Sequence, residues 1–306
     1  MDPDPAFLRQ AIPALRTALS AERITVGYST SAKYLISYPG GARAVLRVAP
    51  DGANAKNEEL VRVLAELRAV GARVPAPLDA GQVGNRAYCL LSFIEGKAAL
   101  DALGRCPPDA QCAVGVQAGA DLRRMHRVLP ARPVRPWDER ILDKHRAGLA
   151  AYWTCGVRVE HDEEIAAFIE ANADAVRGRP SHFQHGDFHV ANLVMRDQRY
   201  AGAIDFDRWD WGDPYQEFLK VGFFSSAVSV PFCNGQIHGY FDGATPDGFW
   251  RLCAVYTAMS VLGSVVWARR RTPDEVDEMV EFSNRVTGDY DQFRSVVPRW
   301  FQPVRG

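Results

Sequence analysis

Residues 183–213, FQHGDFHVANLVMRDQRYAGAIDFDRWDWGD, carry most of the information about the architecture of this protein. Two apolar runs in this stretch read as β-strands, yet several carboxylates, an amide and histidines stand beside them. A buried segment tolerates so many polar and charged groups only when they are paired, hydrogen-bonded or bound to a metal. The stretch therefore indicates a chemical site built around a short, dry hairpin.

We expect residues 191–207 to form this hairpin, with its turn centred on Gln198-Arg199. In that register Asn192 and Asp205 lie opposite each other at the open end of the ribbon. An amide oxygen and a carboxylate at one place suit a hard cation such as Mg²⁺, which completes its shell with phosphate and water. Asp187 lies five residues before Asn192, so it can reach the same space without being a metal ligand.

The hydrophobic pattern of the chain changes from strand-like to helical near residue 96. Before it, extended runs at 23–38, 43–48, 73–78 and 86–93 and a helix at about 55–69 predict a small sheet carrying one helix. After it, the periodicity becomes helical, with helices expected at about 107–126, 139–154, 162–176, 214–224, 246–268 and 273–293. This pattern predicts an α+β fold, with a β-rich lobe over residues 1–96 and a larger α-helical lobe over residues 97–306.

Composition excludes several classes of protein. The net charge of −1 gives no general attraction to nucleic acid or anionic lipid, so neither is an expected partner. The six cysteines show no CxxC pair and no metal-ligand spacing, which favours the reducing cytoplasm over a disulfide or zinc framework. The N-terminus, MDPDPAFLRQ, lacks the apolar run of a signal peptide. The uncharged residues 252–268 are at the short limit for a membrane span, and we interpret them as a buried helix.

Three motifs in order, HGDFHVAN, IDFD and GDPYQEF, resemble the aminoglycoside phosphotransferase family. This family is a branch of the protein-kinase-like superfamily that also includes choline-kinase-type enzymes. The loop HxDxxxxN followed by a metal-binding Asp is the arrangement of kinase-like phosphoryl transfer. The resemblance covers most of the chain and is strongest over residues 183–218. It implies a bilobal kinase-like fold with Mg²⁺ and with ATP or GTP as co-substrate.

The resemblance also implies roles for single residues in the second lobe. Asp187 is the expected catalytic base, and Asn192 and Asp205 are the expected Mg²⁺ ligands. The remaining polar residues have supporting or undecided roles: His185 braces the loop, Asp213 bonds nearby amides or caps a helix, and Asp207 contacts metal or substrate or caps the next segment.

In the first lobe the resemblance implies a nucleotide site. The segment GYSTSAKYLI resembles the loop over the phosphates, where Ser29, Thr30 and Ser31 can offer hydroxyls and amides. Arg47 falls at the position of the family's phosphate-binding lysine, a departure that changes the donor geometry. Its partner on the helix is expected to be Glu58 or Glu59, although a direct match by spacing falls on Asn57; of these we select Glu58.

The segment CLLSFIEG resembles the hinge between the lobes. The backbone groups of Ser92, Phe93 and Ile94 are expected to meet the edge of the adenine or guanine base. Only a short segment separates Asp205 from the GDP motif, and no APE motif follows it. A protein substrate is therefore disfavoured, and a small hydroxyl compound is expected.

The sequence leaves three hypotheses for the function open. Acidic clusters at residues 160–164 and 273–281 suit a cationic antibiotic, although acidic residues at helix starts also favour the helix dipole. Aromatic residues after Asp205 can line a less polar pocket or simply belong to the core. The first reading is antibiotic phosphorylation, the second is the same chemistry on an amino alcohol or sugar, and the third is a non-catalytic binding module. The intact catalytic loop disfavours the third.

Overall fold

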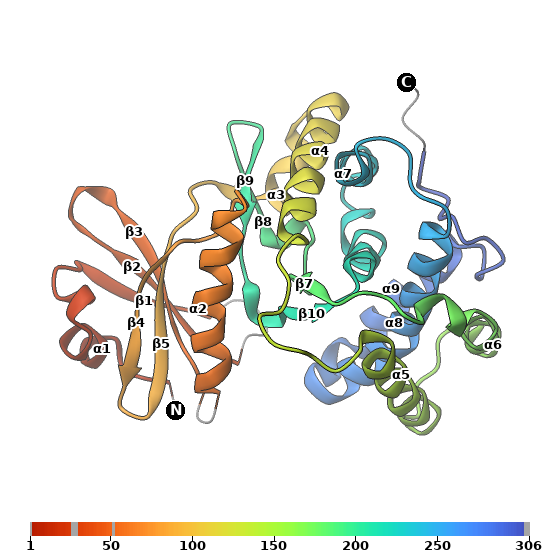
Figure 1. Cartoon of the computed structure of the whole chain (residues 1–306), viewed down its shortest axis with the longest axis horizontal. Helices are drawn as coiled ribbons and strands as arrows, with labels where there is room; N and C mark the ends of the chain where they lie inside the picture. The colour runs from red at the N-terminus through yellow and green to blue at the C-terminus, as the bar shows by residue number, and fades with distance from the viewer. Residues whose placement is uncertain (1, 26–29, 51–52, 303–306) are drawn as a thin grey trace. The chain divides into compact units, whose positions relative to one another are not determined.

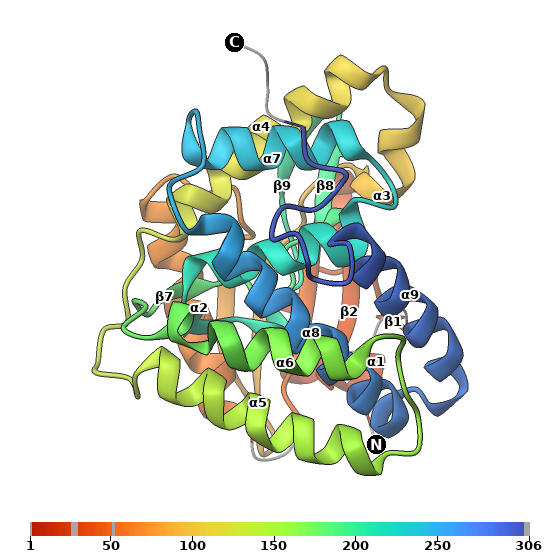
Figure 2. The same cartoon turned by 90° about the vertical axis from the view of Figure 1, so that its right-hand side faces the viewer.

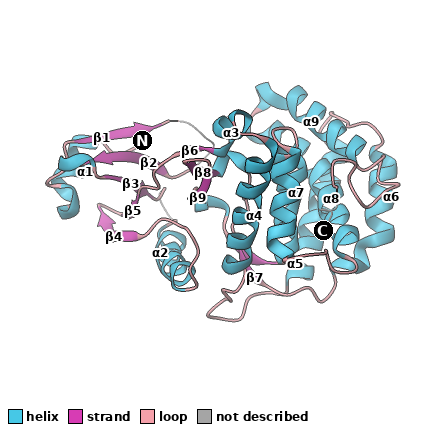
Figure 3. Cartoon of the chain, turned by 90° about the horizontal axis from the view of Figure 1, so that it is seen from above, coloured by secondary structure: helices cyan, strands magenta, loops and turns pink. Residues whose placement is uncertain are grey.

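The computed structural model describes residues 2–25, 30–50 and 53–302, and the chain divides into two compact units. Unit 1 comprises Met1–Gly96 together with Ala201–Asp207, and unit 2 comprises Lys97–Tyr200 together with Arg208–Gly306. A sheet dominates unit 1 and helices dominate unit 2 (Figures 1 and 3). The mixed α+β class predicted from the sequence is confirmed.

Unit 1 is built on a five-stranded antiparallel sheet of order β1-β2-β3-β5-β4. Its strands are β1 (Ser20–Ile24), β2 (Ala32–Ser37), β3 (Arg43–Val48), β4 (Pro77–Val83) and β5 (Arg86–Ser92). Two helices accompany it, α1 (Pro5–Ala11) and α2 (Asn54–Ala69). Side chains of β2 alternate between buried and half-buried, as expected for a strand with one face on a core.

The helix α1 was not predicted from the sequence. It begins where Asp4 accepts a hydrogen bond from the amide of Phe7 and where Pro5 occupies the first helical turn. Both features favour a helix start. Its Leu8 is fully buried in a core cluster that includes Ile36 and Leu46 of the sheet. Burial against the sheet thus stabilises a helix too short to persist alone.

Residues 201–207 lie in unit 1, whereas the predicted lobe boundaries placed them with the helical part of the chain. The amide of Ala203 donates to the carbonyl of Arg73 at 3.0 Å. Asp205 and Asp207 form ion pairs with side chains of β2 and β3. These contacts join residues distant in sequence, so periodicity along the chain gave no sign of them.

Unit 2 contains most of the helices. They are α3 (Ala99–Ala102), α4 (Pro108–Met125), α5 (Trp137–Thr154), α6 (Asp162–Asn172), α7 (Val230–Phe241), α8 (Phe249–Arg271) and α9 (Val276–Asp289). Short strands accompany them: β6 (Lys97–Ala98), β7 (His182–Gln184), β8 (Leu193–Arg196) and β10 (Asp210–Gly212). Strand β9 (Arg199–Ala203) begins in unit 2 and ends in unit 1. The predicted helix at 214–224 is instead a 3₁₀ segment, Pro214–Phe218, followed by a π-helical segment, Val221–Ser225.

Helices α4 and α7 lie side by side (Figures 1 and 3) and are packed through glycines. A Cβ on Gly115 or Gly119 of α4 would lie 2.1 or 2.0 Å from a carbonyl oxygen of α7. A Cβ on Gly235 or Gly239 of α7 would meet α4 in the same way, at 2.2 and 2.1 Å. The glycines that disfavour α7 by propensity are thus the residues that allow its backbone to approach α4, and α7 was missed from the sequence for this reason.

Helix α8 runs beside α5 and α6 (Figure 2) through the core of unit 2. Among the described residues, it is the helix long and apolar enough to cross a membrane by length and composition. In the structure, 72% of its most apolar stretch is buried inside the protein. Its side chains, including Val255, Val261 and Leu262, form part of the main hydrophobic cluster.

The hairpin predicted from the opening stretch is present, but its turn lies at Asp197-Gln198, one residue earlier than predicted. Both turn residues have left-handed φ values, 51° and 57°. This is the geometry of a two-residue turn whose twist matches that of the strands. The predicted register, which placed Asn192 opposite Asp205, is therefore wrong, and both residues lie beyond the ends of β8 and β9.

Candidate active site

The predicted site residues fall into two groups, and the first lies in unit 1 around Asp205 and Asp207. Lys33 of β2 places its Nζ 2.8 Å from Asp205 Oδ1 and 2.7 Å from Asp207 Oδ2. Arg47 of β3 donates through Nη2 to Asp207 Oδ1 and, at 3.2 Å, to Ser31 Oγ. Lys33 and Arg47 are register partners on adjacent strands, so they present their charges to the same face of the sheet.

The electrostatics of this group fit a hard cation. Burial raises the pKa of Asp205, and neighbouring Asp207 raises it further against the opposing effect of Lys33. Asp205 also has a left-handed φ of 64°, an unusual backbone state for a residue with a side chain. Closely spaced carboxylate oxygens are ligands that Mg²⁺ prefers. A divalent cation would relieve the repulsion that raises the pKa of Asp205.

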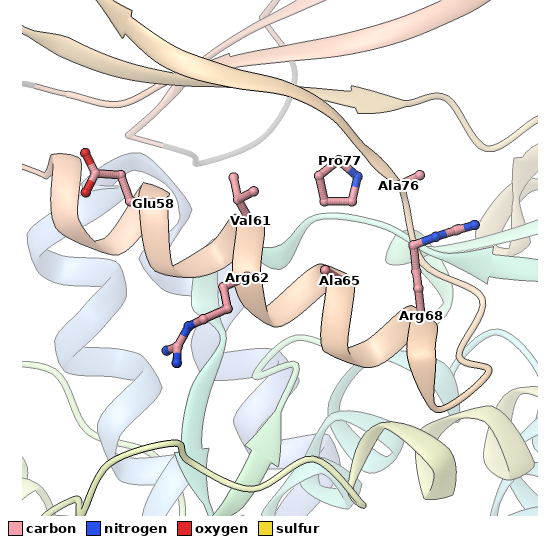
Figure 4. A pocket seen from close by; sticks show the side chains of 7 residues that line it. All are labelled: Glu58, Val61, Arg62, Ala65, Arg68, Ala76 and Pro77. Atoms are coloured by element: carbon pink, nitrogen blue, oxygen red, sulfur yellow. The ribbon is translucent and has the colours of Figure 1, made fainter.

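Arg47 does not pair with Glu58, contrary to the prediction. Its partners are Ser31 and Asp207, and the side chain is buried. Glu58 is exposed on α2, where it lines a shallow pocket of about 470 Å³ with Val61 and Pro77 (Figure 4). Asn57 is the α2 residue that turns inward, and its Oδ1 accepts from the thiol of Cys89 at 3.6 Å. The prediction was wrong because the helical phase puts position 57, rather than 58, toward the sheet.

The predicted phosphate loop is described only in part. Ser29 lies outside the described residues, and Thr30 is exposed. Ser31 is buried, and its hydroxyl oxygen accepts from Arg47. The structure thus brings Ser31 to the charged group of unit 1.

The predicted hinge residues lie at the end of β5. The amide of Ser92 donates to the carbonyl of Ala76 at 2.8 Å, and its hydroxyl accepts from the amide of Ala76 at 2.8 Å. The Phe93 ring lies 4.1 Å beneath the guanidinium carbon of Arg43. Ile94 follows, and its Cδ1 closely approaches the backbone of Gly202. The segment is therefore held at both Ser92 and Phe93.

The second group lies in unit 2 around Asp187. Lys220 Nζ lies 2.9 Å from Asp187 Oδ1. Asn192 Nδ2 donates to Asp187 Oδ2 at 3.1 Å, and His189 Nε2 lies 3.6 Å from the same oxygen. Arg208 Nε is 3.9 Å away. Burial by itself raises the pKa of Asp187, but the hydrogen bond from His189 and the charge of Lys220 outweigh it, so the pKa lies well below its ordinary value. Asp187 is therefore ionised near neutral pH.

Residues beneath the Asp187 loop hold its backbone. The amide of Asp187 donates to Nδ1 of the fully buried His185 at 3.2 Å. The amide of Gly186 donates to Oε1 of Glu217 at 2.6 Å. A side chain cannot replace the hydrogen of Gly186, because φ is +77° and a Cβ would lie 2.3 Å from the carbonyl oxygen of Arg208. Burial raises the pKa of Glu217 to about 7, against the effect of the Gly186 hydrogen bond.

Asn192 is oriented by the same carboxylate. Its Nδ2 donates both to Asp187 Oδ2 and, at 3.0 Å, to the backbone carbonyl of Asp187. Because both partners are acceptors, these hydrogen bonds fix which end of the Asn192 amide is the nitrogen. The carbonyl oxygen Oδ1 is left as the atom with which Asn192 could bind a cation.

Asp213 joins three elements of unit 2. It caps the 3₁₀ segment Pro214–Phe218 by accepting from the amide of Tyr215 at 3.1 Å. It accepts two hydrogen bonds from Arg179, at 2.7 and 2.9 Å, and one from the Tyr256 hydroxyl of α8 at 2.8 Å. The side chain of Asp213 is fully buried, where an unpaired charge would be costly. The guanidinium of Arg179 compensates that charge.

The sequence analysis missed Lys220, His189 and Glu217. Lys220 is a single charge within the apolar run FLKVGFF, residues 218–224, which is a detectable signal because an isolated lysine there requires a partner. His189 stands inside the HGDFHVAN motif itself. Glu217 gave no separate signal, since its role depends on tertiary contact with Gly186.

The acidic clusters lie at helix starts. Asp162 is the first residue of α6, and it accepts from Arg158 and from the Tyr152 hydroxyl. The cluster 273–281 forms a 3₁₀ turn and the first turns of α9. Of the aromatic residues after Asp205, Trp209, Trp211 and Phe223 are buried, whereas Phe224 lies beside His189 with ring centroids 4.6 Å apart.

Relatives by sequence cover part of the chain. A viomycin phosphotransferase of Streptomyces vinaceus is 26% identical over 179 residues, which are 54% of this chain and 60% of the relative. A glucosamine kinase of Streptacidiphilus jiangxiensis is 32% identical over 123 residues, 35% of this chain and 26% of the relative. The matches thus span less than two thirds of the length of these curated relatives.

Solved structures match nearly the whole fold. A thermostable mutant of aminoglycoside phosphotransferase APH(4)-Ia, in ternary complex with ADP and hygromycin B, has a TM-score of 0.68 at 16% identity and covers 93% of this chain and 97% of its own. The GDP complex of wild-type aminoglycoside 2'-phosphotransferase-IIIa has a TM-score of 0.70 at 16% identity and covers 92% and 97%. These likenesses confirm the kinase-like fold.

The sequence model of one protein family, described as "Phosphotransferase enzyme family", matches residues 20–251. The match includes the sheet of unit 1, the catalytic loop motif and the GDP motif. The chain therefore belongs to the phosphotransferase enzyme family.

Proposed function

We propose that this protein is a small-molecule O-phosphotransferase that moves the γ-phosphate of ATP or GTP to a hydroxyl group of an antibiotic. The observation that carries the proposal is the ionised Asp187, whose two carboxylate oxygens are oriented by Lys220 and Asn192 inside the HGDFHVAN loop. A positioned carboxylate is the group that accepts or orients the proton of an attacking hydroxyl. We place this reaction in the cytoplasm, where ATP and GTP are available.

Each neighbour of Asp187 has a distinct part in this proposal. Asn192 and Lys220 hold the two oxygens at separate points, which leaves the carboxylate one orientation toward the acceptor. His185 and Glu217 fix the loop backbone at Asp187 and Gly186. The low pKa keeps Asp187 ready to interact with the hydroxyl proton, while the phosphoryl group carries most of the charge to be stabilised.

The nucleotide side of the reaction is assigned to residues of unit 1 and to Asn192 of unit 2. Asn192 and Asp205 are the proposed Mg²⁺ ligands, and Mg²⁺ would neutralise phosphate charge when bound. Asp207 has its carboxylate bound to Lys33 and Arg47, which favours a role in fixing these cations. The segment Ser92 to Ile94 is the proposed contact for the edge of the base.

The acceptor is proposed from the relatives and from charge. One curated relative is named for viomycin, and one structural neighbour holds hygromycin B, which supports an antibiotic acceptor. The second candidate is a sugar metabolite, because the other relative is a glucosamine kinase. The charged groups next to Asp187 include the cations Lys220 and Arg208. This favours an acceptor whose reacting hydroxyl lies away from its own cationic groups.

The proposal is tested with viomycin, hygromycin B and glucosamine, each supplied with ATP or GTP and Mg²⁺, and with product detection by mass spectrometry. We expect one acceptor to gain the mass of a phosphoryl group, HPO₃. Asp187→Asn should lower transfer by about 10²–10⁴-fold, while nucleotide affinity by calorimetry stays within a few-fold. Asp205→Ala should abolish the Mg²⁺-dependent turnover.

The two variants separate the roles from each other. Transfer by Asp187→Asn at the wild-type rate would exclude Asp187 as the base. A parallel loss of nucleotide affinity in this variant would make it a structural or metal-binding residue. Turnover by Asp205→Ala in the presence of EDTA would remove the metal assignment.

A further inference from the structure

The four charged side chains of the cluster in unit 1, Lys33, Arg47, Asp205 and Asp207, differ in exposure. Arg47 has a side chain only 9% exposed, and its guanidinium is held by Asp207 and by the hydroxyl of Ser31. Among the residues that the structure describes, the Lys33 ammonium pairs with the carboxylates of Asp205 and Asp207. Asp205 is the most exposed of the four side chains, at 35%. The Lys33–Asp205 contact therefore lies at the open side of the cluster, and the Arg47–Asp207 contact lies at its closed side.

The chemistry of the two cations differs in the same direction. A guanidinium is a planar fork, which suits a fixed position between two acceptors. A lysine ammonium is a point charge on a flexible four-carbon stem and can change partners without rebuilding the site. Lys33 is thus the cation of this cluster that can move, and Arg47 is the one that stays.

We infer that Lys33, from strand β2, is the phosphate anchor of this protein and that it blocks Asp205 until metal and nucleotide arrive. This inference rests on the proposed function. The ammonium of Lys33 donates to Asp205 Oδ1 at 2.8 Å. A divalent cation held by Asp205 would repel the ammonium, and nucleotide phosphates would offer it new acceptors. Lys33 then exchanges Asp205 for a phosphate oxygen, while Arg47 remains a positioning residue that fixes Asp207.

This role differs from the one first given to Arg47. The family pattern places a lysine at position 47, on β3, where this chain has an arginine. Lys33 is the register partner of Arg47 on the neighbouring strand, so its side chain starts from the adjacent point on the same face of the sheet. In this chain the lysine of the cluster thus stands on β2, beside the arginine on β3.

The inference predicts opposite changes in two affinities of one variant, both measured without turnover. Lys33→Met should bind Mn²⁺ alone several-fold more tightly than the wild type, because Asp205 loses its competing cation; free Mn²⁺ is followed by electron paramagnetic resonance. The same variant should bind the non-hydrolysable nucleotide AMP-PNP with Mg²⁺ roughly 10–100-fold more weakly by calorimetry, because a charged hydrogen bond to phosphate is lost. Lys33→Arg should retain most of the nucleotide affinity.

Two further variants make the comparison specific. Lys97→Met removes an exposed lysine of unit 2 and should leave both affinities unchanged. Arg47→Met should weaken nucleotide binding less than Lys33→Met does, without tightening Mn²⁺ binding to the same extent. Circular dichroism tests whether each variant is folded. If Lys33→Met does not fold, the Mn²⁺ and AMP-PNP affinities of Lys33→Arg are used in its place.

The outcomes divide clearly. Unchanged or weaker Mn²⁺ binding in Lys33→Met overturns the blocking role, and unchanged AMP-PNP affinity overturns the anchoring role. A larger nucleotide loss in Arg47→Met than in Lys33→Met returns the anchor to Arg47. If Lys33→Met is unfolded, a Lys33→Arg variant whose Mn²⁺ and AMP-PNP affinities both fall overturns the exchange. A wild-type protein that binds neither ATP nor GTP contradicts the proposed function itself, whereas normal wild-type binding with an unaffected Lys33→Met contradicts the inference alone.

Discussion

At the scale of single residues, Lys220 shows how one cation can both orient a carboxylate and keep it ionised. Its ammonium lies 2.9 Å from Asp187 Oδ1, and it also stands 5.1 Å from the centroid of the Phe224 ring. The side chain is only 17% exposed, so its attraction to Asp187 is weakly screened. Lys220 therefore acts on the orientation and the ionisation of Asp187 together.

Removing this cation should impair transfer more than binding. We expect Lys220→Met to lower the rate of phosphate transfer by about 10–100-fold, the value of one charged hydrogen bond, with AMP-PNP affinity within twofold of wild type. Lys220→Arg should restore part of the rate because it retains the charge. Steady-state kinetics and calorimetry measure the two effects, with Lys97→Met as the control. A full rate in Lys220→Met would mean that Asn192 alone orients Asp187.

At the scale of elements, the α4–α7 pair behaves as one packed unit. Four glycines let the two backbones approach closely, because each would-be Cβ lies within 2.2 Å of a carbonyl oxygen on the other helix. Such an interface gains contact area between backbones and has no space for an added methyl group. It is therefore more sensitive to small-to-large changes than an ordinary helix surface.

The sensitivity is measurable with two glycine-to-alanine variants in helices. Gly119→Ala should reduce the free energy of unfolding by roughly 1–3 kcal/mol or more, because the new Cβ meets the Gln236 carbonyl oxygen. Gly148→Ala, in α5, meets no atom within 4 Å and should increase stability by up to about 1 kcal/mol through helix propensity. Urea denaturation followed by circular dichroism compares them. Equal effects in the two variants would show that α4 and α7 can separate at little cost.

At the scale of the whole molecule, the buried Glu217 links stability to pH. Its folded-state pKa of about 7 lies above the ordinary glutamate value of 4.5, so the folded protein favours the protonated form. For a group with a raised pKa, the contribution to stability is complete below the unfolded pKa and is lost as pH rises through the folded one. The free energy of unfolding should therefore fall between about pH 4.5 and pH 7.

Replacing the carboxyl by an amide should remove this dependence. The gap between the two pKa values corresponds to about 3 kcal/mol, which sets the largest expected change. Glu217→Gln resembles the protonated side chain and cannot ionise, so its stability should vary less across this range than that of the wild type. Urea denaturation at a series of pH values measures the difference. Parallel curves for both proteins would show that folding does not raise the pKa of Glu217.

Part of this protein could be derived from the order of residues in the chain. The motif HGDFHVAN carries Asp187, Asn192 and His185 within one loop, so the spacing alone brought them together. The α+β class followed from a change of periodicity near residue 96, since helices and strands bury side chains at different intervals. The family followed from three motifs in order, and the match over residues 20–251 agrees with it.

Only the tertiary structure decided which charges meet. Lys33 and Asp205 form an ion pair although they are 172 positions apart in the sequence. Arg47 pairs with Asp207 and not with Glu58, because α2 turns Asn57 toward the sheet and Glu58 toward solvent. The hairpin turn lies at Asp197-Gln198, one residue before the predicted position, and both turn residues have a left-handed backbone. This backbone conformation is favoured in two-residue turns because it matches the twist of the strands. Local pattern determines which residues occupy a loop or a face, whereas ion pairing depends on distances in space. Those distances exist only after the strands of unit 1 have been brought side by side.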